Sequence, residues 1–469
     1  MGDATDDIGD EGPHLPDADI RLVEGALDAQ DCDTARAALA DMSALEIADL
    51  LGKLSAQDRG DILADYPDLL PPEAFTEMDP ELRRAALTAL GPERVAAIVA
   101  ALESDDALDM LRNLETDLQD EALKRLSATL RAQIETGLAF PEDSAGRLMQ
   151  RDFVAVPQFW TVGKTIDYLR AAADTLPQDF SDVFVITPTY RVVGEVPAGR
   201  LLRARRTEKV EALARPAPHP IPATMDQEEV AHLFRRKDLL SAPVVDEDER
   251  LIGVITIDDV VDVIHEEAAE DILRLAGVEA EGDLYRAALG TSAVRFRWLF
   301  VNLLTAIAAS AVIGVFEDAL QKVVALAILM PIVASMGGNA GGQALAVAVQ
   351  ALATKQISAA NRWRIIGKEA LVGLVNGVAF AVIMGAVAAW WFADPRLGAI
   401  IAAAMVANLV AAGLAGAGVP ILLARLGADP AVASTVVMTT VTDIVGFAAF
   451  LGLAAVSYTH LTLPTIYSV

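Results

Sequence analysis

The chain has 469 residues, 53% of them hydrophobic, and a formal net charge of −29. The two properties are segregated: positions 298–456 hold 7 basic and 6 acidic residues, positions 457–469 hold none, and positions 1–297 hold 30 basic and 60 acidic residues. An acidic, water-soluble front therefore precedes an apolar region, and its charge argues against a nucleic acid partner, whose phosphates it would repel.

The N-terminal part divides into a tail and a helical domain. Residues 1–19 are acidic and lack an apolar stretch, so we expect a disordered tail and no secretory signal. Residues 20–140 are rich in Ala and Leu at helical spacing, with a faint repeat at an offset of 48 residues, which predicts a superhelix of short helices. The dipeptide Gly91-Pro92 marks a break between helices, and Asp79, which precedes a proline, marks a helix start.

Residues 141–264 change to short Val- and Ile-rich runs that alternate with helical stretches, in two similar units of about 60 residues. The second unit contains Ser241–Asp246 (SAPVVD) and Leu251–Val260 (LIGVITIDDV), which are very similar to the end of a CBS domain. The resemblance implies tandem CBS domains, a module that senses ligands or bears domain contacts. Residues 265–297, which begin with the charged segment HEEAAEDILRL, are expected to form a plug-like connecting helix.

Uncharged runs dominate residues 298–456. About 20 apolar residues in a helix span the roughly 30 Å of a bilayer's hydrocarbon core, and five runs meet that length approximately. We therefore expect a multidomain protein: an α-helical superhelix, an α/β CBS-domain pair, a connecting helix, and an all-α transmembrane domain with five helices in the lipid bilayer. The runs are Leu299–Phe316, Val323–Thr354, Ala370–Ala393, Leu397–Ala424 and Pro430–Val456.

Basic residues in the loops between these runs predict the orientation. If the N-terminal half is cytosolic, seven Lys and Arg residues flank the membrane on the cytosolic side, and only Lys322 and Arg396 lie outside. This pattern predicts a multi-pass protein of the cell inner (plasma) membrane, with cytosolic N-terminal domains and the C-terminus outside.

Asp443 is the residue least suited to a membrane interior. It lies 13 residues into the last uncharged run, roughly 20 Å along a helix. A carboxylate at that depth is unfavourable unless it faces water, a partner or an ion. Thr439 and Thr440 lie nearby and would add oxygen ligands. We interpret Asp443 as an ion-pathway residue; a protonated Asp bonded to a neighbouring helix is the alternative.

The second run contains the string PIVASMGGNAGGQ, from Pro331 to Gln343. Glycines combined with Asn and Gln suit either a water-filled path or a close helix crossing. We take Gly338, Asn339 and Gln343 as candidate pore-lining residues, together with Asn408 in the fourth run, and leave close packing open. Small residues recur every four positions in the third run and predict a packing face: Gly373, Gly377, Ala381 and Gly385.

These motifs resemble the membrane domain of the MgtE family of magnesium channels. The resemblance rests on P-x5-GGN-x-GGQ in the second run, Asn408 and Pro420 in the fourth, Asp429-Pro430, and TT-x-x-D-x-x-GF around Asp443; the domain order agrees over residues 20–456. It implies a homodimer with its pore at the subunit interface, in which Asp443 of both chains selects Mg²⁺ for import into the cytosol. Residues 457–469 depart from the family pattern, which leaves open whether they are native.

The resemblance also implies regulatory Mg²⁺ ions between the helical domain, the CBS pair and the connecting helix. Carboxylates one helical turn apart can face one ion, and the acidic soluble part repels itself without cations. We predict that high cytosolic Mg²⁺ neutralises these carboxylates and closes the pore. The candidate ligands are Asp105, Asp109, Asp258, Asp259, Glu266, Glu267, Glu270 and Asp271.

Ligand chemistry separates the candidate ions and functions. Mg²⁺ keeps much of its water and needs few carboxylates, and none of the five His residues is placed as a ligand in the membrane. A carrier for another divalent cation such as Co²⁺, with a CBS pair that senses an adenine nucleotide, and a non-conducting membrane sensor are the alternatives. The sequence contains no P-loop, nucleophile elbow or metal-hydrolase His spacing, so we do not expect an enzyme.

Overall fold

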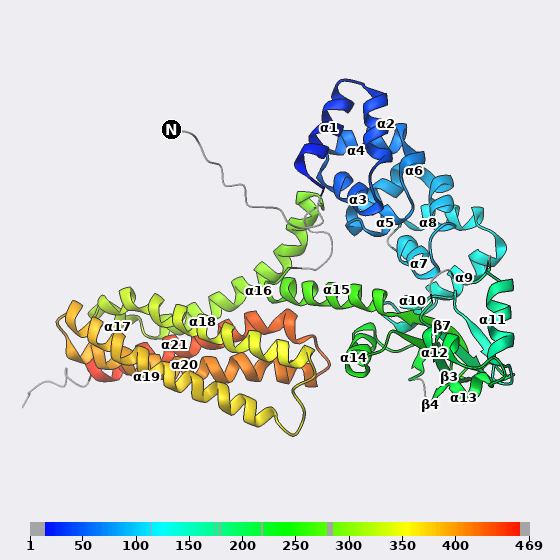
Figure 1. Cartoon of the computed structure of the whole chain (residues 1–469). Helices are drawn as coiled ribbons and strands as arrows, with labels where there is room; N and C mark the ends of the chain where they lie inside the picture. The colour runs from blue at the N-terminus through cyan, green and yellow to red at the C-terminus, as the bar shows by residue number, and fades with distance from the viewer. Residues whose placement is uncertain are drawn as a thin grey trace, which may run out of the picture. The chain divides into compact units, whose positions relative to one another are not determined.

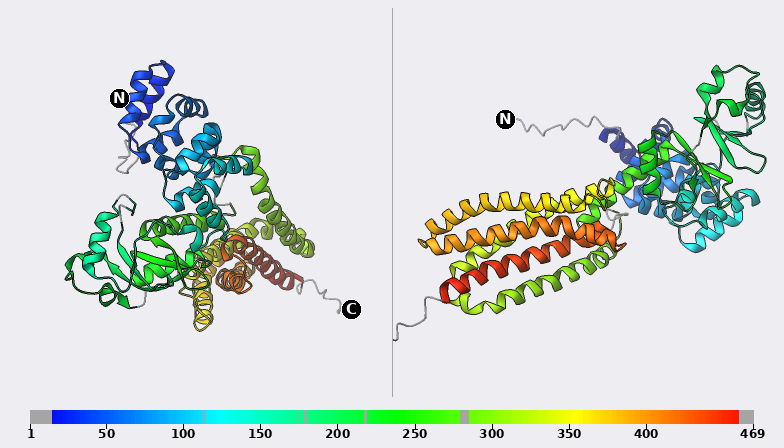
Figure 2. Two further views of the ribbon diagram at one scale, coloured as in Figure 1. Left: turned by 90° about the vertical axis from the view of Figure 1, so that its right-hand side faces the viewer. Right: turned by 90° about the horizontal axis from the view of Figure 1, so that it is seen from below.

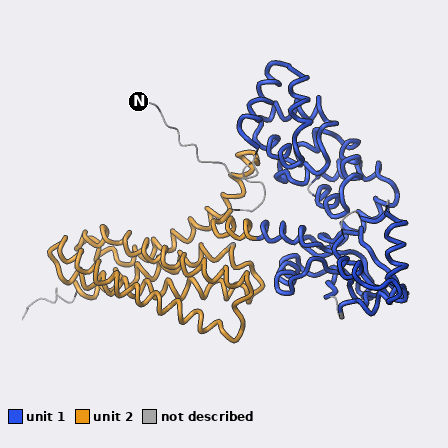
Figure 3. Tube along the Cα trace, viewed as in Figure 1, with its two compact units in different colours: residues 1–267 blue, residues 268–469 orange. Residues whose placement is uncertain are grey.

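The computed structural model describes residues 15–112, 114–173, 175–177, 180–216, 219–278 and 285–459. It divides into two compact units, residues 1–267 and 268–469 (Figure 3). Residues 1–14 of the expected acidic tail and residues 460–469 of the atypical C-terminal segment lie outside the described residues.

The first unit begins with short helices packed around one apolar core (Figure 1). The first helix starts at Asp17, inside the segment expected to be a disordered tail, and Leu15 before it is buried. The elements are α1 (Asp17–Asp28), α2 (Cys32–Ala40), α3 (Ala44–Lys53), α4 (Ala56–Asp65), η1 (Pro67–Leu69), α5 (Glu73–Thr76), α6 (Pro80–Val99), α7 (Ser104–Arg112), α8 (Thr116–Arg125) and α9 (Ala128–Leu138).

Local sequence explains where these helices start and stop. Ser43 and Glu46 form a reciprocal capping box at the start of α3, and the Asp79 carboxylate accepts a hydrogen bond from the Glu81 N–H at the start of α6. Gly91 has φ of 76°, a conformation that favours glycine, and it kinks α6 where the Gly-Pro dipeptide predicted a break. The kink turns the second half of α6 into a separate core-facing segment.

Two α/β repeats follow, and the antiparallel strand pairs β2–β3 and β6–β7 correspond in sequence at an offset of 59 residues. In each repeat a short parallel strand pairs with a central strand, which pairs antiparallel with the next strand, and the register shifts at Val185/Ile186 and again at Val244/Val245. The elements are α10 (Ala145–Leu148), β1 (Ala155–Pro157), α11 (Val162–Ala171), β2 (Asp182–Ile186), β3 (Val192–Pro197), α12 (Ala198–Arg203), α13 (Val210–Leu213), β4 (Arg215–Pro216), β5 (Ile221–Pro222), α14 (Gln227–Lys237), β6 (Ser241–Val245) and β7 (Leu251–Thr256).

The two repeats contact each other through equivalent residues. The Ser241 hydroxyl donates a 2.7 Å hydrogen bond to the Asp182 carboxylate, and Arg191 forms a β-bridge with Arg250. Both pairs are related by the 59-residue offset. The repeats therefore form one pair, as expected for tandem CBS domains.

Helix α15 (Ile257–Leu275) starts before, and ends within, the segment 265–297 that was expected to form the connecting helix. The charged segment that starts at His265 is the second half of this helix, and Ile257 follows β7 directly. The boundary expected at residue 265 is therefore a change in composition within one continuous helix.

The second unit contains five helices that are long and apolar enough to cross a membrane, which confirms the number expected. In Figure 2, α18 to α21 run side by side as a bundle. The elements are α16 (Ala288–Val315), α17 (Glu317–Lys322), α18 (Ala325–Ala353), α19 (Arg362–Trp391), α20 (Pro395–Arg425) and α21 (Pro430–Thr459); α17 is the short helix that does not span.

Helix α20 is the centre of the bundle. It contacts α18, α19 and α21. In its most apolar stretch of 18 residues 56% is buried, whereas the corresponding stretch of α16 is 6% buried. Added Cβ atoms on Gly373 and Gly377 would meet the α20 backbone at Leu409 and Val406. This confirms the packing face expected on the third membrane helix.

Candidate ion pathway and acidic cluster

Asp443 lies near the middle of α21 and is half-buried. Within the described part of the chain, no ion pair or hydrogen bond is formed by its carboxylate. The threonines before it donate their hydroxyl protons to their own helix: Thr439 Oγ1 to the Thr435 carbonyl at 2.8 Å and Thr440 Oγ1 to the Val436 carbonyl at 2.7 Å. Their oxygens retain lone pairs that can accept hydrogen bonds from water or coordinate a cation.

Helix α18 separates its polar residues from its packing residues. Gly337 and Gly341 are buried and face Asn408 and Met438, whereas Gly338 faces open space in the single chain. Asn339 and Gln343 are exposed, and they continue with Ser335 along one helix face at four-residue spacing. A polar strip on a membrane helix needs water or another protein surface beside it.

Asn408, a candidate pore-lining residue for which close packing was left open, lies inside the helix packing. Its side chain is fully buried, and its Nδ2 donates to the Val333 carbonyl at 2.8 Å. Its Oδ1 is buried and lacks a hydrogen-bond partner among the described residues. Asn408 therefore connects α20 to α18.

An acidic cluster in the first unit joins the start of α7 to the start of α15. It consists of Asp105, Asp106 and Asp259. Burial first, and then the charges of Asp259 and Asp106, raises the pKa of Asp105 well above its ordinary value. Burial raises the pKa of Asp106 to about 6, with Asp259 as the next cause. Burial also raises the pKa of Asp259 to about 6, against the hydrogen bond from the Thr256 hydroxyl at 2.7 Å.

A second acidic group lies further along the same two helices. Asp109 pairs with Arg83, with 2.8 Å between Oδ2 and Nη2. Burial raises the pKa of Glu266, the charges of Asp109 and Asp262 add to this, and Arg112 and Arg83 oppose it. Arg83 therefore acts on both groups: it pairs with Asp109, and its charge opposes the rise in the pKa of Asp106.

The remaining expected ligands lie elsewhere. Asp258 is exposed, and Glu267 accepts a 3.0 Å hydrogen bond from Gln227. Glu270 belongs to the second unit, with Asp271, and pairs with Arg274. In the ranges that the structure describes, no three His, Cys, Asp or Glu side chains are close enough to hold a metal ion together.

Sequence reasoning missed several carboxylates that the fold encloses, among them the half-buried Asp106 and the buried Glu369. Asp106 is adjacent to Asp105, and only the fold shows that both are enclosed. Glu369 is buried in α19 at the edge of its uncharged run, with Lys368 at 3.5 Å. Its position one residue before that run is the signal that was available.

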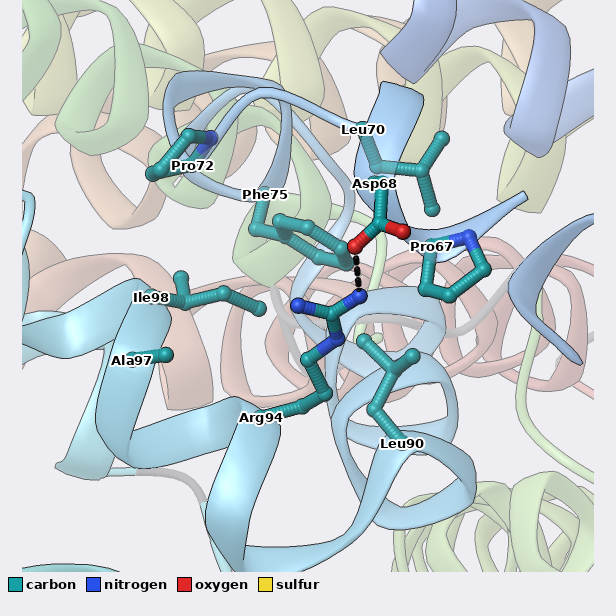
Figure 4. Close-up of a pocket in the computed structure, with 9 residues that line it drawn as sticks. All are labelled: Pro67, Asp68, Leu70, Pro72, Phe75, Leu90, Arg94, Ala97 and Ile98. Carbon is teal, nitrogen blue, oxygen red and sulfur yellow. Dashed lines mark hydrogen bonds and ion pairs between the residues drawn. The ribbon is translucent and has the colours of Figure 1, made fainter.

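A cavity of about 180 Å³ opens in the helical part of the first unit, between η1, α5 and α6. Figure 4 shows the Arg94 guanidinium turned toward the Asp68 carboxylate, with the Phe75 ring beside them. The ion pair is neutral, and most of the other lining residues are apolar. This chemistry does not favour a cation, and we assign the cavity no part in transport.

Comparison with known proteins gives matches over most of the chain. Family models match for a divalent cation transporter (MgtE) over residues 330–453, the MgtE intracellular N domain over residues 42–143, and a CBS domain over residues 210–266. The first of these ranges contains Asn339, Asn408 and Asp443.

Two curated relatives agree with these models. The chain is 35% identical over 328 residues to the magnesium transporter MgtE of Thermus thermophilus, covering 69% of this chain and 72% of that protein. It is 33% identical over 315 residues to magnesium transporter MgtE of Bacillus subtilis, covering 67% and 70%. The cytosolic domain of the Mg²⁺ channel MgtE, solved in complex with ATP, is similar with 29% identity and a TM-score of 0.48, covering 52% of this chain and 99% of that one.

Proposed function

Because the chain belongs to the MgtE family, a family of magnesium transporters, we propose that it conducts Mg²⁺ across the membrane past Asp443. The observation that carries the proposal is the half-buried Asp443 carboxylate at mid-helix in α21, within the range that matches the divalent cation transporter model. The family consists of transporters, and we expect no enzymatic activity.

The chemistry of the path suits a hydrated ion. Mg²⁺ binds oxygen ligands in an octahedron and dehydrates reluctantly, so one carboxylate with several hydrogen-bond acceptors for its waters is sufficient. Thr439 and Thr440 offer such acceptors, since their protons are already used within α21. The exposed amides of Asn339 and Gln343 on α18 would supply others, with Gly338 allowing close approach.

We infer a homodimer with the path at its interface. The polar strip of α18 is exposed in one chain, and a lipid-facing position would leave its amides unsatisfied. A second copy would cover this strip and bring a second Asp443 to the same path.

We propose the inner (plasma) membrane as the location, with the first unit in the cytosol and the C-terminus outside. The support is the loop between α18 and α19 and the start of α19, which carry Lys355, Arg362 and Arg364, whereas the opposite side carries Lys322 and Arg396. Import into the cytosol then follows the membrane potential.

We propose cytosolic Mg²⁺ as the regulator that closes the path. The donor set of Asp105, Asp106 and Asp259 consists of hard carboxylate oxygens, and Asp105 Oδ1 is buried without a partner among the described residues. A hydrated Mg²⁺ fits these donors because it needs only one or two carboxylates and fills its other positions with water. Asp109 and Glu266, further along α7 and α15, would hold a further hydrated ion, and Asp258, Glu267, Glu270 and Asp271, which lie elsewhere, stay predictions.

An adenine nucleotide at the CBS pair is a second regulatory ligand that we propose only for the second repeat. In that repeat the Thr256 hydroxyl donates a hydrogen bond to the Asp259 carboxylate. The equivalent positions of the first repeat are Pro197 and Arg200, which have neither a hydroxyl nor a carboxylate. Because Asp259 also belongs to the acidic cluster, nucleotide and Mg²⁺ would influence the same carboxylate.

The test is uptake by the full chain reconstituted in liposomes that contain a Mg²⁺-sensitive dye. We expect uptake of Mg²⁺ that excess Ca²⁺ inhibits weakly and that empty liposomes lack. Stronger transport of Co²⁺ than of Mg²⁺ would favour the carrier for another divalent cation. No flux of any divalent ion from well-folded protein would favour the non-conducting sensor.

A further inference from the structure

We propose that Asn408 is a positioning residue for the transport path: it holds α21, and with it Asp443, in register against α18. This inference rests on the proposed function of Asp443. It assigns Asn408 a role in the bundle interior and not on the wall of the path.

The hydrogen bond of Asn408 fixes the orientation of its amide. Nδ2 lies 2.8 Å from the Val333 carbonyl oxygen, which can only accept, so the NH₂ group must point to α18. The side chain is fully buried, so water does not compete for this bond in the described bundle. The amide therefore ties α20 to one residue of α18.

The same amide packs closely against a glycine on each of two neighbouring helices, α18 and α21. A Cβ atom added to Gly337 would lie 2.2 Å from Asn408 Nδ2, and one added to Gly446 would lie 2.8 Å from it. Real Cβ atoms do not approach other atoms this closely, so an alanine at either position would force the Asn408 amide to shift. Asn408 thus fits between the backbones of α18 and α21.

The glycine on α21 that Asn408 contacts is close to the Asp443 carboxylate. Gly446 follows Asp443 by three residues, and residues three apart on a helix are neighbours on its surface. A shift of α21 at Gly446 would therefore move Asp443 relative to α18, whose polar strip we place beside the same path.

Packing alone does not require an amide at this position. Asn408 Oδ1 is buried without a donor among the described residues, and leaving a buried oxygen unpaired is unfavourable. A leucine has the same branched arrangement of side-chain atoms without that disadvantage but could not bind the Val333 carbonyl. The variant Asn408→Leu therefore removes the hydrogen bond while the site stays filled.

The experiment measures Mg²⁺ uptake by the full chain in liposomes, with the maximal rate and the half-saturating Mg²⁺ concentration determined separately. We expect Asn408→Leu and Gly446→Ala to lower the maximal rate by about tenfold or more, since small misplacements of a reacting group have effects of this size. Gly452→Ala is the matched control on α21, because its Cβ would lie 3.7 Å from its nearest neighbour, and it should keep the wild-type rate.

The double variant Asn408→Ala/Gly446→Ala provides the second test. Removing the amide makes room for the new methyl group, so the double variant should be no slower than Gly446→Ala alone. Protein that is monodisperse and as helical as wild type is compared throughout, and Gly446→Ala decides the matter if Asn408→Leu does not fold.

The inference is overturned if Asn408→Leu transports at the wild-type rate with unchanged Mg²⁺ dependence. It is also overturned if the fold-losses in uptake rate caused by Asn408→Ala and by Gly446→Ala multiply in the double variant. Absence of Mg²⁺ uptake by wild type is a different result, because it removes the proposed function and the inference together.

Discussion

Arg274, near the end of α15, pairs with Asp429, directly before α21, with 2.7 Å between Nη1 and Oδ2. The same guanidinium contacts Glu270, and the Thr435 hydroxyl donates to the Leu275 carbonyl at 2.9 Å. The end of α15 is thus attached to the first turns of the helix that carries Asp443. Asp259 of the acidic cluster lies at the start of the same helix.

Arg274→Gln should weaken the inhibition of uptake by Mg²⁺ on the cytosolic side. The pair is about one-third exposed, so it contributes at most about 1 kcal/mol, and the half-inhibiting Mg²⁺ concentration should rise about two- to fivefold. Arg425→Gln, at the exposed end of α20, is the control. An unchanged inhibition curve for Arg274→Gln would show that this contact does not transmit the signal.

The pKa values of the acidic cluster predict how stability depends on pH. Asp106 and Asp259 have pKa values raised to about 6 in the folded chain, from about 4 when unfolded. Below pH 4 both are protonated in either state, and as the pH rises through 6 the folded chain must ionise them at a cost. Without divalent ions, the full chain should therefore resist proteolysis of its first unit better at pH 5 than at pH 7.

Millimolar Mg²⁺ should remove most of this difference, because the ion stabilises the ionised carboxylates. The measurement is the rate of limited proteolysis at pH 5 and pH 7, each with EDTA and with Mg²⁺. Equal rates with and without Mg²⁺ at pH 7 would contradict the regulatory role of the cluster.

Asp106→Asn should stabilise the first unit at pH 7 in EDTA by about 1–3 kcal/mol, since the variant need not ionise in a buried position. It should also reduce the stabilisation that Mg²⁺ gives. The exposed Asp61→Asn in α4 should change neither quantity. A destabilised Asp106→Asn that responds fully to Mg²⁺ would argue that Asp106 is only structural.

Two glycines in the membrane bundle should respond differently to alanine. A Cβ on Gly416 would lie 2.5 Å from the Gly341 carbonyl oxygen, and one on Gly342 would have no neighbour within 4 Å. Gly416→Ala should therefore destabilise the bundle by about 1–3 kcal/mol, while Gly342→Ala should be neutral or slightly stabilising. Thermal unfolding of the full chain in detergent compares them, and equal melting temperatures would contradict the packing described here.

Much of the architecture follows from the sequence because it depends on simple patterns. Runs without charge predict the membrane helices, and the packing face of α19 follows from small residues at four-residue spacing. The continuity of α15 through residue 265 was not predicted, because the change in charge at His265 resembles a boundary while backbone hydrogen bonds continue through it.

The candidate site was harder to predict, because a polar residue in an apolar helix can either face a water-filled path or pack against a neighbouring helix. Asn339 and Asn408 have the same side chain and similar neighbours in sequence, yet one is exposed and the other is fully buried. Only the packing of three helices around Asn408 separates them. Asp106 was missed for a similar reason, since burial of adjacent aspartates depends on contacts between α7 and α15 that no local pattern records.

If Asp443 acts on a moving cation, the initial rate of Mg²⁺ uptake must depend on its charge, which Asp443→Asn removes. The substitution keeps the shape of the side chain, and Asp318→Asn in the exposed helix α17 is the matched control. We expect Asp443→Asn to lose most of the uptake and Asp318→Asn to keep it. Uptake by Asp443→Asn at the wild-type rate and with wild-type preference for Mg²⁺ would show that the Asp443 carboxylate does not act on the ion.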